Sequence, residues 1–299
     1  MLSIVVCSKN KTLTKDLVDN IINTVGVEYE IITIDNSENK YSIFSAYNLG
    51  FTKSKYKYIC FVHEDVFFQS QNWGKKVIAH LQDPVTGIIG LAGGDLVSRV
   101  PAAWSGFLSQ SKNIIQSDCT GKKPTKIIHL PENFIQSQRP VILLDGVFMC
   151  MRRELMEIIR FDEKINGFHG YDFDISIQST VKGFVNYVIY DIELEHFSRG
   201  KTDAVYYRNL ISVYKKWERF LPLFLKDITQ KQLTEISKIE ENNLFRLLKK
   251  LARKGFKSNE IKTEIHYYAN IITSKKAVNC LELRIFFIRL FNSPKQLFK

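Results

Sequence analysis

The chain contains no long hydrophobic run, and no window approaches the roughly 18 uncharged apolar residues that a membrane-spanning helix needs. The apolar run that starts at Leu2 is short and no basic segment precedes it, so we expect no signal peptide. With 15 glycines and 7 prolines, the chain is not collagen-like or of low complexity. Aromatic residues make up 12%, which argues against long-range disorder. The 299 residues therefore predict one large folded domain or two smaller ones.

Cysteine is also scarce, and its spacing matches no metal or redox motif. The five cysteines are an odd number, with no CxxC pair and no metal-finger spacing. Cys7, Cys60 and Cys150 lie within apolar runs, where a free thiol packs as a small hydrophobic group. We therefore expect free thiols, no disulfide framework and a reducing, cytoplasmic compartment.

The positive charge is concentrated at one end of the chain. Residues 243–299 contain 13 Lys and Arg but 3 Asp and Glu, a net charge of +10, whereas residues 1–242 contain 29 and 28, a net charge of +1. Such a division indicates two functional parts. Within the basic part, Leu244–Lys257 and Cys280–Phe291 combine an apolar stripe at helical spacing with a basic face. Two interpretations stay open: helices lying on an anionic membrane surface, or a helical subdomain with a solvated basic face.

Apolar runs typical of strands alternate with helix-like stretches over the first 91 residues. The expected strands are Leu2–Cys7, Glu30–Ile34, Tyr58–Val62 and Gly87–Leu91, and the expected helices are Thr14–Val25, Ile43–Lys53 and Trp73–Leu81. This alternation predicts an α/β fold with a parallel sheet that is covered on both faces.

The pattern is less regular after this point. We expect a long, functional loop region over 94–139 that contains one short strand at Lys126–Leu130. The sequence then predicts strands at Val141–Met151 and Phe184–Ile192, with a helix at Arg153–Arg160 between them. From Thr202 onward we expect helices only.

Polar residues follow several of the predicted strands, where ligands bind in open α/β sheets. They are Ser8-Lys9-Asn10, Asp35-Asn36-Ser37, His63-Glu64-Asp65 and Glu195-His196. Asp65 is our first choice as ligand to Mg²⁺ or Mn²⁺ held against a diphosphate, because these ions prefer oxygen. His196 is a second ligand if the ion is Mn²⁺, which also accepts imidazole. His63 and Glu64 point either into the core or toward a bound sugar.

A second acidic segment, FDEKINGFHGYDFDI over Phe161–Ile175, places two carboxylates after turns at Gly167 and Gly170. Asp172 is a candidate general base for an acceptor hydroxyl. Asp174 is expected to cap or support the helix that follows.

Seven segments occur in an order that resembles a known family. They are SIVVCSKN, IDNSEN, AYNLG, YICFVHEDV, DGVFMCMRRE, GFHGYDFD and EHFSRG. Together they resemble a family 2-like glycosyltransferase of the GT-A fold, from a bacterial branch in which the DxD motif reads His-x-Asp. The resemblance covers about residues 1–220 and implies a Rossmann-like mixed α/β sheet. Residues 221–299 then form a basic α-helical C-terminal region.

The resemblance also implies roles for individual residues. The donor, most simply a UDP-sugar, would be bound by residues at the strand ends and beyond them. These are Ser8, Asn10, Asp35, Asn48, Glu64, Asp65 and Asp145. Asp35 matches the carboxylate that contacts base or ribose, and Asp65 the last residue of the DxD motif. His196 matches a histidine near the metal or diphosphate, and Asp172 the general base of inverting members.

Three positions depart from the family pattern. His63 replaces the first Asp of DxD, which leaves fewer anionic metal ligands. Tyr171 replaces the Glu of a Glu-Asp pair, and Lys9 stands where many members have another residue. Asp65 and Asp172 are retained, so we expect activity.

The resemblance thus implies a metal-dependent, inverting glycosyltransferase that builds bacterial surface glycans on a glycan or lipid-linked acceptor. Trp104, in the long loop region, and His63 are candidates for contact with sugar or metal. One alternative is a non-catalytic nucleotide- or glycan-binding protein on the same fold. A nucleotidyltransferase would need a Gly-rich phosphate loop, and Cys7–Thr12 contains no glycine. Nucleic acid is not expected as a partner, because no base-reading motif accompanies the charge.

Overall fold

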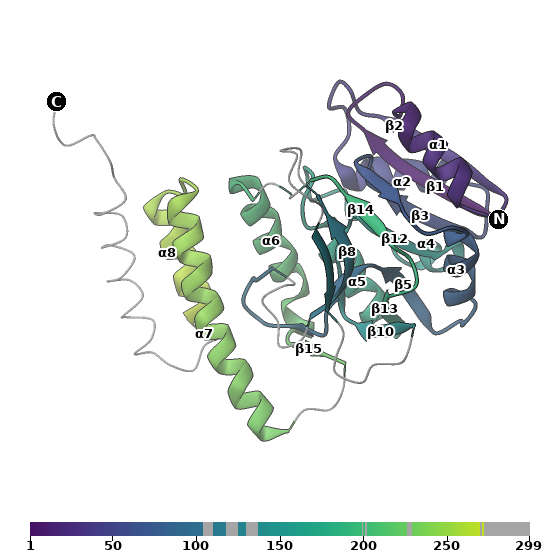
Figure 1. The fold of residues 1–299 in the computed structure, drawn as a ribbon. Helices are drawn as coiled ribbons and strands as arrows, with labels where there is room; N and C mark the ends of the chain where they lie inside the picture. The colour runs from purple at the N-terminus through teal and green to yellow at the C-terminus, as the bar shows by residue number, and fades with distance from the viewer. Residues whose placement is uncertain are drawn as a thin grey trace.

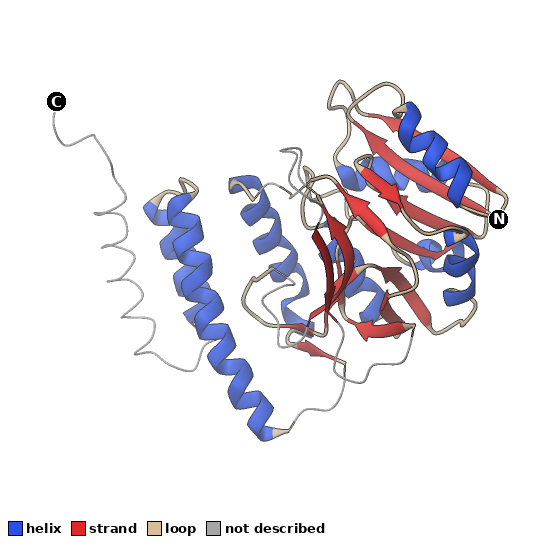
Figure 2. Cartoon of the chain, viewed as in Figure 1, coloured by secondary structure: helices blue, strands red, loops and turns tan. Residues whose placement is uncertain are grey.

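A computed structural model describes residues 1–103, 110–117, 125–129, 137–198, 200, 202–225, 229–269 and 271. Its centre is a seven-stranded mixed sheet (Figures 1 and 2). In spatial order its strands are β10 (Gln138–Val141), β13 (Val185–Ile189), β5 (Thr86–Gly90), β12 (Phe148–Arg152), β3 (Tyr58–Val62), β1 (Leu2–Ser8) and β2 (Tyr29–Asp35). β1 is parallel to β2 and β3, whereas β12 is antiparallel to β3 and β5. The predicted α/β class is confirmed, and the sheet is mixed, as the resemblance implied, rather than parallel throughout, as the alternation of runs predicted.

Alternation along β1 explains how helices cover both faces of this sheet. Ile4 and Val6 contribute to the core beneath α1 (Lys15–Thr24) and α3 (Trp73–His80). Val5 points to the opposite face, beneath α2 (Ile43–Lys53) and α5 (Tyr171–Val181). All three side chains are fully buried, as expected for a central strand of a covered sheet. The carboxyl ends of β1, β2 and β3 thereby meet at one edge.

A second sheet lies against that edge and corrects the predicted long loop. Its spatial order is β11 (Leu143–Leu144), β6 (Ala92–Gly94), β8 (Gln110–Gln116), β14 (Leu194–His196) and β4 (Val66–Phe68), with β9 (Thr125–His129) paired to β8. Region 94–139 therefore contains β8 as well as the expected short strand. β8 reads QSKNIIQ, a largely polar stretch without the alternation of polar and apolar residues that marks a half-buried strand, and this hid it among loop-like sequence.

Three other expectations about strands are wrong. The predicted strand Val141–Met151 is broken at Asp145, whose carboxylate accepts a hydrogen bond from the Val147 amide at 3.0 Å, so that β11 and β12 join different sheets. The chain after Thr202 is not purely helical, because β15 (Leu223–Phe224) pairs with β7 (Leu96–Val97). β14, not Phe184–Ile192, is the strand that runs into His196.

The expectation of free thiols is also wrong for two cysteines. Antiparallel pairing of β3 with β12 sets Cys60 directly opposite Cys150, and a disulfide joins them. The two residues are 90 positions apart, so no local spacing revealed the pair. Cys7 is a free thiol.

The C-terminal helices pack on α6 (Ala204–Trp217), which settles the interpretation of Leu244–Lys257. This segment lies in α7 (Gln230–Arg253) and the turn before α8 (Ser258–Ala269). Its apolar stripe, which includes Leu244, Leu248 and Leu251, is fully buried against residues of α6 and α8. That stripe is therefore unavailable to a membrane, and the helical-subdomain interpretation holds here. Cys280–Phe291 lies outside the described residues.

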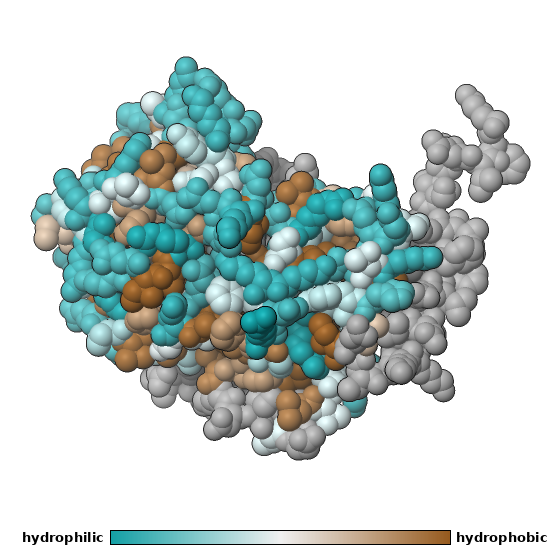
Figure 3. All heavy atoms as spheres, turned by 180° about the vertical axis from the view of Figure 1, so that it is seen from behind, coloured by the Kyte–Doolittle hydropathy of each residue, from teal (hydrophilic) through white to brown (hydrophobic). Residues whose placement is uncertain are grey.

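Polar contacts also attach α7 to the rest of the protein. Glu240, only 1% exposed, accepts hydrogen bonds from the Arg99 amide and guanidinium at 2.6–3.1 Å. Asn243 donates to Ser98 at 3.3 Å. On the face seen in Figure 3, small hydrophobic patches are scattered among polar residues. Among the helices described, none is both long and apolar enough to cross a bilayer.

Candidate active site

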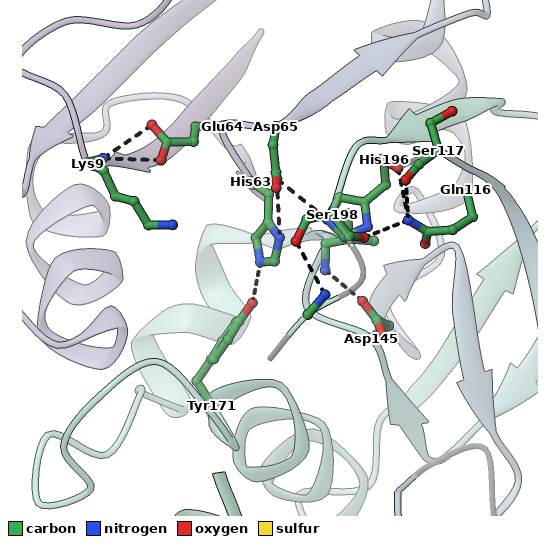
Figure 4. Close-up of polar contacts among 12 residues, drawn as sticks. Lys9, His63, Glu64, Asp65, Gln116, Ser117, Asp145, Tyr171, His196 and Ser198 are labelled. Carbon is green, nitrogen blue, oxygen red and sulfur yellow. Dashed lines mark hydrogen bonds and ion pairs between the residues drawn. The ribbon is translucent and has the colours of Figure 1, made fainter. Parts of the chain in front are cut away.

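Three side chains converge where β3 and β14 end. His63 and Asp65 follow β3, and His196 is the last residue of β14. Asp65 Oδ1 lies 3.8 Å from Nδ1 of His63 and 3.5 Å from Nε2 of His196. One potential ligand atom from each residue lies within 4.8 Å of the other two (Figure 4). The structure therefore brings together Asp65 and His196, both predicted as ligands, with His63.

These residues fit a divalent cation. Nε2 of His196 is buried, and apart from the long 3.5 Å approach of Asp65 Oδ1 it has no hydrogen-bond partner among the described residues; a metal would satisfy this nitrogen. Two imidazole nitrogens and one carboxylate oxygen suit Mn²⁺ better than Mg²⁺, which prefers oxygen alone. Burial lowers the pKa of His63, with Asp65 opposing, and this favours the neutral imidazole that ligation needs. Burial alone would raise the pKa of Asp65, but the adjacent His196 and His63 lower it.

Tyr171 fixes the orientation of His63. Its hydroxyl lies 2.7 Å from Nε2 of His63, so Nδ1 is the nitrogen that faces Asp65 (Figure 4). A hydrogen bond from Nε2–H to the tyrosine oxygen would leave the Nδ1 lone pair available to a cation. Tyr171 reaches this position because residue 146 is glycine: a Cβ there would overlap the tyrosine hydroxyl. Tyr171, at the position where the resemblance implies a Glu, therefore has a defined structural role.

His196 is held in place by β8, the strand that sequence reasoning missed. Gln116 donates through Nε2 to the carbonyls of His196 and Ser198, at 3.0 and 2.6 Å. The Ser117 amide donates to the His196 carbonyl at 3.0 Å, and the Ser117 hydroxyl donates to Glu195. The sequence of β8, QSKNIIQ, has no strand-like alternation and gave no signal of this support.

Asp172 and Asp145 line a cavity of about 430 Å³ together with His63 and His196. Asp172 lies at the start of α5, where its Oδ1 accepts from the Phe173 amide at 3.0 Å. Burial, then the nearby charge of Asp145, raises the pKa of Asp172 from 3.8 to about 7. A carboxylate with such a pKa suits a general base that works near neutral pH. The structure thus places the predicted base and Asp145 in one cavity with the histidines.

The end of β1 is organised by Glu64. Its carboxylate accepts from the Ser8 hydroxyl at 2.6 Å and from the Lys9 amide at 3.2 Å. Ser8 Oγ in turn accepts from the Asn10 amide at 3.0 Å. Ser8, Asn10 and Glu64 therefore form one network beside Asp65, and their contact with a donor stays a prediction.

The other predicted donor residues lie apart from this network. Asp35 is exposed at the end of β2, next to Ser8 in register, and the Ser37 amide lowers its pKa. The side-chain amide of Asn48 is hydrogen-bonded to the segment before α5. Its nitrogen donates to the Phe161 carbonyl and to Glu163, both at 2.8 Å, and its oxygen accepts from the Phe161 amide. A role for Asn48 in lining the nucleotide pocket stays a prediction beside this structural one. Trp104 lies outside the described residues.

Asp174 has the supporting role expected of it, but it does not cap α5, which begins after Gly170. Its buried carboxylate lies 2.7 Å from Lys216 Nζ and accepts from Trp217 Nε1 at 2.8 Å. It thereby ties α5, which carries Asp172, to α6.

A protein-family model described as a glycosyltransferase-like family matches residues 3–208. The chain belongs to this family. No curated protein sequence matches the chain significantly.

Several solved structures share the fold of this family member. GalNAc-T7 with UDP, GalNAc and Mn²⁺ has a TM-score of 0.50 at 14% identity, over 90% of this chain and 57% of that one. S. aureus TarS has a TM-score of 0.53 at 11% identity, over 100% of this chain and 56% of that one. The structure of S. aureus TarS residues 1–349 with UDP-GlcNAc has a TM-score of 0.51 at 14% identity, over 97% of this chain and 87% of that one. The chain thus spans a little over half of GalNAc-T7 and of the longer TarS structure, and the likeness identifies a GT-A fold.

Proposed function

We propose that this protein transfers a sugar from a nucleoside diphosphate sugar to an acceptor hydroxyl, with inversion and with a divalent cation as cofactor. The observation that carries the proposal is one cavity lined by Asp172, Asp145, His63 and His196, with Asp65 against the two histidines. Membership of the glycosyltransferase-like family supports the same reaction class.

Asp172 acts as the general base of this reaction. It accepts the proton of the acceptor hydroxyl while that oxygen attacks the anomeric carbon of the donor. The bond from the anomeric carbon to the diphosphate oxygen breaks in the same displacement, which inverts the configuration and releases the nucleoside diphosphate. The pKa of about 7 leaves a large unprotonated fraction at neutral pH.

His63, Asp65 and His196 would hold the cation, which is Mn²⁺ or Mg²⁺ and supplies Lewis-acid neutralisation of the leaving diphosphate. Tyr171 keeps Nδ1 of His63 directed at the cluster. On the donor side, Ser8, Asn10 and Glu64 shape the loop after β1, and Asp35 contacts base or ribose. We propose UDP as the nucleotide, which the TarS structure with UDP-GlcNAc supports by analogy of fold.

The acceptor is proposed to be a glycan or a lipid-linked glycan of bacterial surface polymers, used on the cytoplasmic side where nucleotide sugars are made. Several basic residues of α7 and of the turn after it are exposed, among them Arg253, Lys254 and Lys257. They would bind an anionic membrane surface by electrostatic attraction alone. Binding to anionic liposomes that is lost in moderate salt would support this location, whereas no binding at low salt would contradict it.

The test is a panel of UDP-, GDP- and dTDP-sugars with Mn²⁺, assayed for released nucleotide and, once a donor is found, for the anomeric configuration of the product. Turnover of one donor that falls at least 100-fold in Asp172→Asn supports the proposal. The altered DxD motif favours a second candidate, a non-catalytic nucleotide- or glycan-binding protein. That candidate predicts nucleotide binding without turnover in either protein.

A further inference from the structure

A groove separate from the Asp172 cavity runs between α1 and β4. It has a volume of about 710 Å³, within the range of about 300–1,000 Å³ that is usual for ligand sites. Asp65 and Glu64 lie at the groove, while the histidines paired with Asp65 line the Asp172 cavity. The α1–β4 groove therefore begins at the proposed transfer site and leads away from it.

The walls of the groove are fixed before any ligand binds. Asn20 of α1 is buried, and its amide bonds the backbone of Phe68 in β4 twice, at 2.7 and 3.0 Å. On the other side, the Phe197 amide donates to the Asp65 carbonyl at 3.0 Å and extends the β4–β14 ladder. A groove held in this way does not need to be ordered by its ligand, and this lowers the cost of binding.

Two aromatic rings are exposed along the groove. Phe67 is 37% exposed and Phe197 is 38% exposed, although neighbouring Phe68 is 1% exposed in the core. Exposed rings within a groove offer apolar faces, while Asn23, Gln69 and Gln71 add amide groups beside them. Stacking faces combined with neutral hydrogen-bonding groups match the alternating C–H and hydroxyl surfaces of a saccharide.

The charge of the groove limits which saccharides it could bind. Among the residues that the structure describes, the charged ones lining the groove are all acidic: Asp16, Asp19, Glu64 and Asp65. Lys15 pairs with Asp19 at 2.6 Å on the exposed side, which leaves the lining net negative. A phosphorylated, sulfated or carboxylated chain would be repelled, whereas an uncharged or amino-bearing chain would not.

We infer that the α1–β4 groove binds an uncharged or amino-bearing oligosaccharide, the part of the acceptor beyond the hydroxyl that receives the sugar. This inference rests on the proposed function for its role, but Phe67, Phe197 and Asp16, which its test changes, have no part in the catalytic proposal. It makes the groove a determinant of acceptor choice rather than of the chemical step.

The test measures retention of the full-length protein on a printed array of uncharged, amino-bearing, carboxylated and phosphorylated oligosaccharides. Uncharged or amino-bearing chains should be retained, and Phe67→Ala or Phe197→Ala should weaken retention about tenfold, which corresponds to the loss of one good stacking contact. Phe220→Ala is the matched control, since Phe220 is 49% exposed but lies in η2 (Glu218–Phe220), outside the groove. Asp16→Lys should increase retention of phosphorylated chains.

Retention of no saccharide, equal retention of anionic chains by the wild-type protein, or equal losses in the Phe220 variant would overturn the inference. Donor hydrolysis by the wild-type protein is measured in parallel. Saccharide retention without donor hydrolysis would count against the proposed function alone, and hydrolysis without retention would count against the groove alone.

Discussion

The hydroxyl of Tyr171 lies 2.7 Å from Nε2 of His63, and this contact joins the helix of the proposed base to the proposed cation site. Tyr171 immediately precedes Asp172 at the start of α5, whereas His63 follows β3. The resemblance implies a carboxylate at each of these two positions. The two residues meet in space, and the tyrosine orients the histidine.

Tyr171→Phe should weaken Mn²⁺ binding about 10- to 100-fold, because His63 loses the partner that fixes its ring. Mn²⁺ affinity is measured by the EPR signal of the free ion. Tyr268→Phe is the matched control: Tyr268 is buried in α8, in a different hydrophobic cluster, and its hydroxyl makes no hydrogen bond within the described part of the chain. Equal Mn²⁺ affinity in the two variants would remove the orienting role from Tyr171.

Gly146→Ala should also weaken Mn²⁺ binding, because the new Cβ would displace the Tyr171 hydroxyl. The same substitution should lower the free energy of unfolding by about 1–3 kcal/mol, the usual cost of overpacking. Gly183→Ala is a partial control with no atom within 4 Å of its added Cβ, although its φ of +89° adds backbone strain. If Gly146→Ala bound Mn²⁺ like the wild type, the close approach of Tyr171 to residue 146 would not be needed for Mn²⁺ binding.

The transfer rate should rise with pH through about 7 and then level off, because Asp172 must be unprotonated to accept the acceptor proton. Asp145→Asn should move this rise to lower pH, since the charge of Asp145 helps to raise the pKa of Asp172. The pH profile of kcat measures both effects. A midpoint that stays unchanged in Asp145→Asn would show that the interaction of Asp172 with Asp145 does not set the pH dependence of kcat.

The same shift has a consequence for stability. The folded pKa of Asp172 is about 7, above the ordinary 3.8, so folded protein binds the proton more tightly than unfolded protein does. Asp172 therefore makes its full contribution to the free energy of unfolding below about pH 4, and this contribution is lost as the pH rises toward about 7. Denaturant unfolding of Asp172→Asn should show a weaker fall in stability across this window than the wild type. An identical fall in both proteins would assign it to other groups.

Leu248→Ala should lower the free energy of unfolding by about 2–5 kcal/mol, because the side chain is fully buried between α7 and its neighbours. Leu233→Ala in the same helix removes the same atoms from a side chain that is 39% exposed, and should cost much less. Urea unfolding measures both. Equal effects would mean that the stripe of Leu244–Lys257 is not part of the core in solution.

Sequence reasoning identified the parts of the site that follow strands directly. The apolar runs of β1, β2 and β3 were distinct, so Asp35 and Asp65 could be placed at one sheet edge. His196 and Asp172 were candidates from their places after a strand and after a turn, and the resemblance then matched them to family roles. It failed where the decisive contact joins distant segments. The Cys60–Cys150 pair, the Tyr171–His63 contact and the support of His196 by Gln116 all depend on strand pairing or helix placement. The amphipathic pattern of α7 could not distinguish burial against α6 from burial in a membrane, because both hide the same stripe.

Glycosyl transfer by this protein should require a cation held by His63, Asp65 and His196. The most direct test measures nucleotide release from the sugar donor found in the panel, with Mn²⁺ or after chelation by EDTA, in the wild type and in Asp65→Ala. The account predicts release by the wild type with Mn²⁺, and a loss of at least 100-fold both with EDTA and in Asp65→Ala. Release that continues unchanged in EDTA, or in Asp65→Ala, would contradict it.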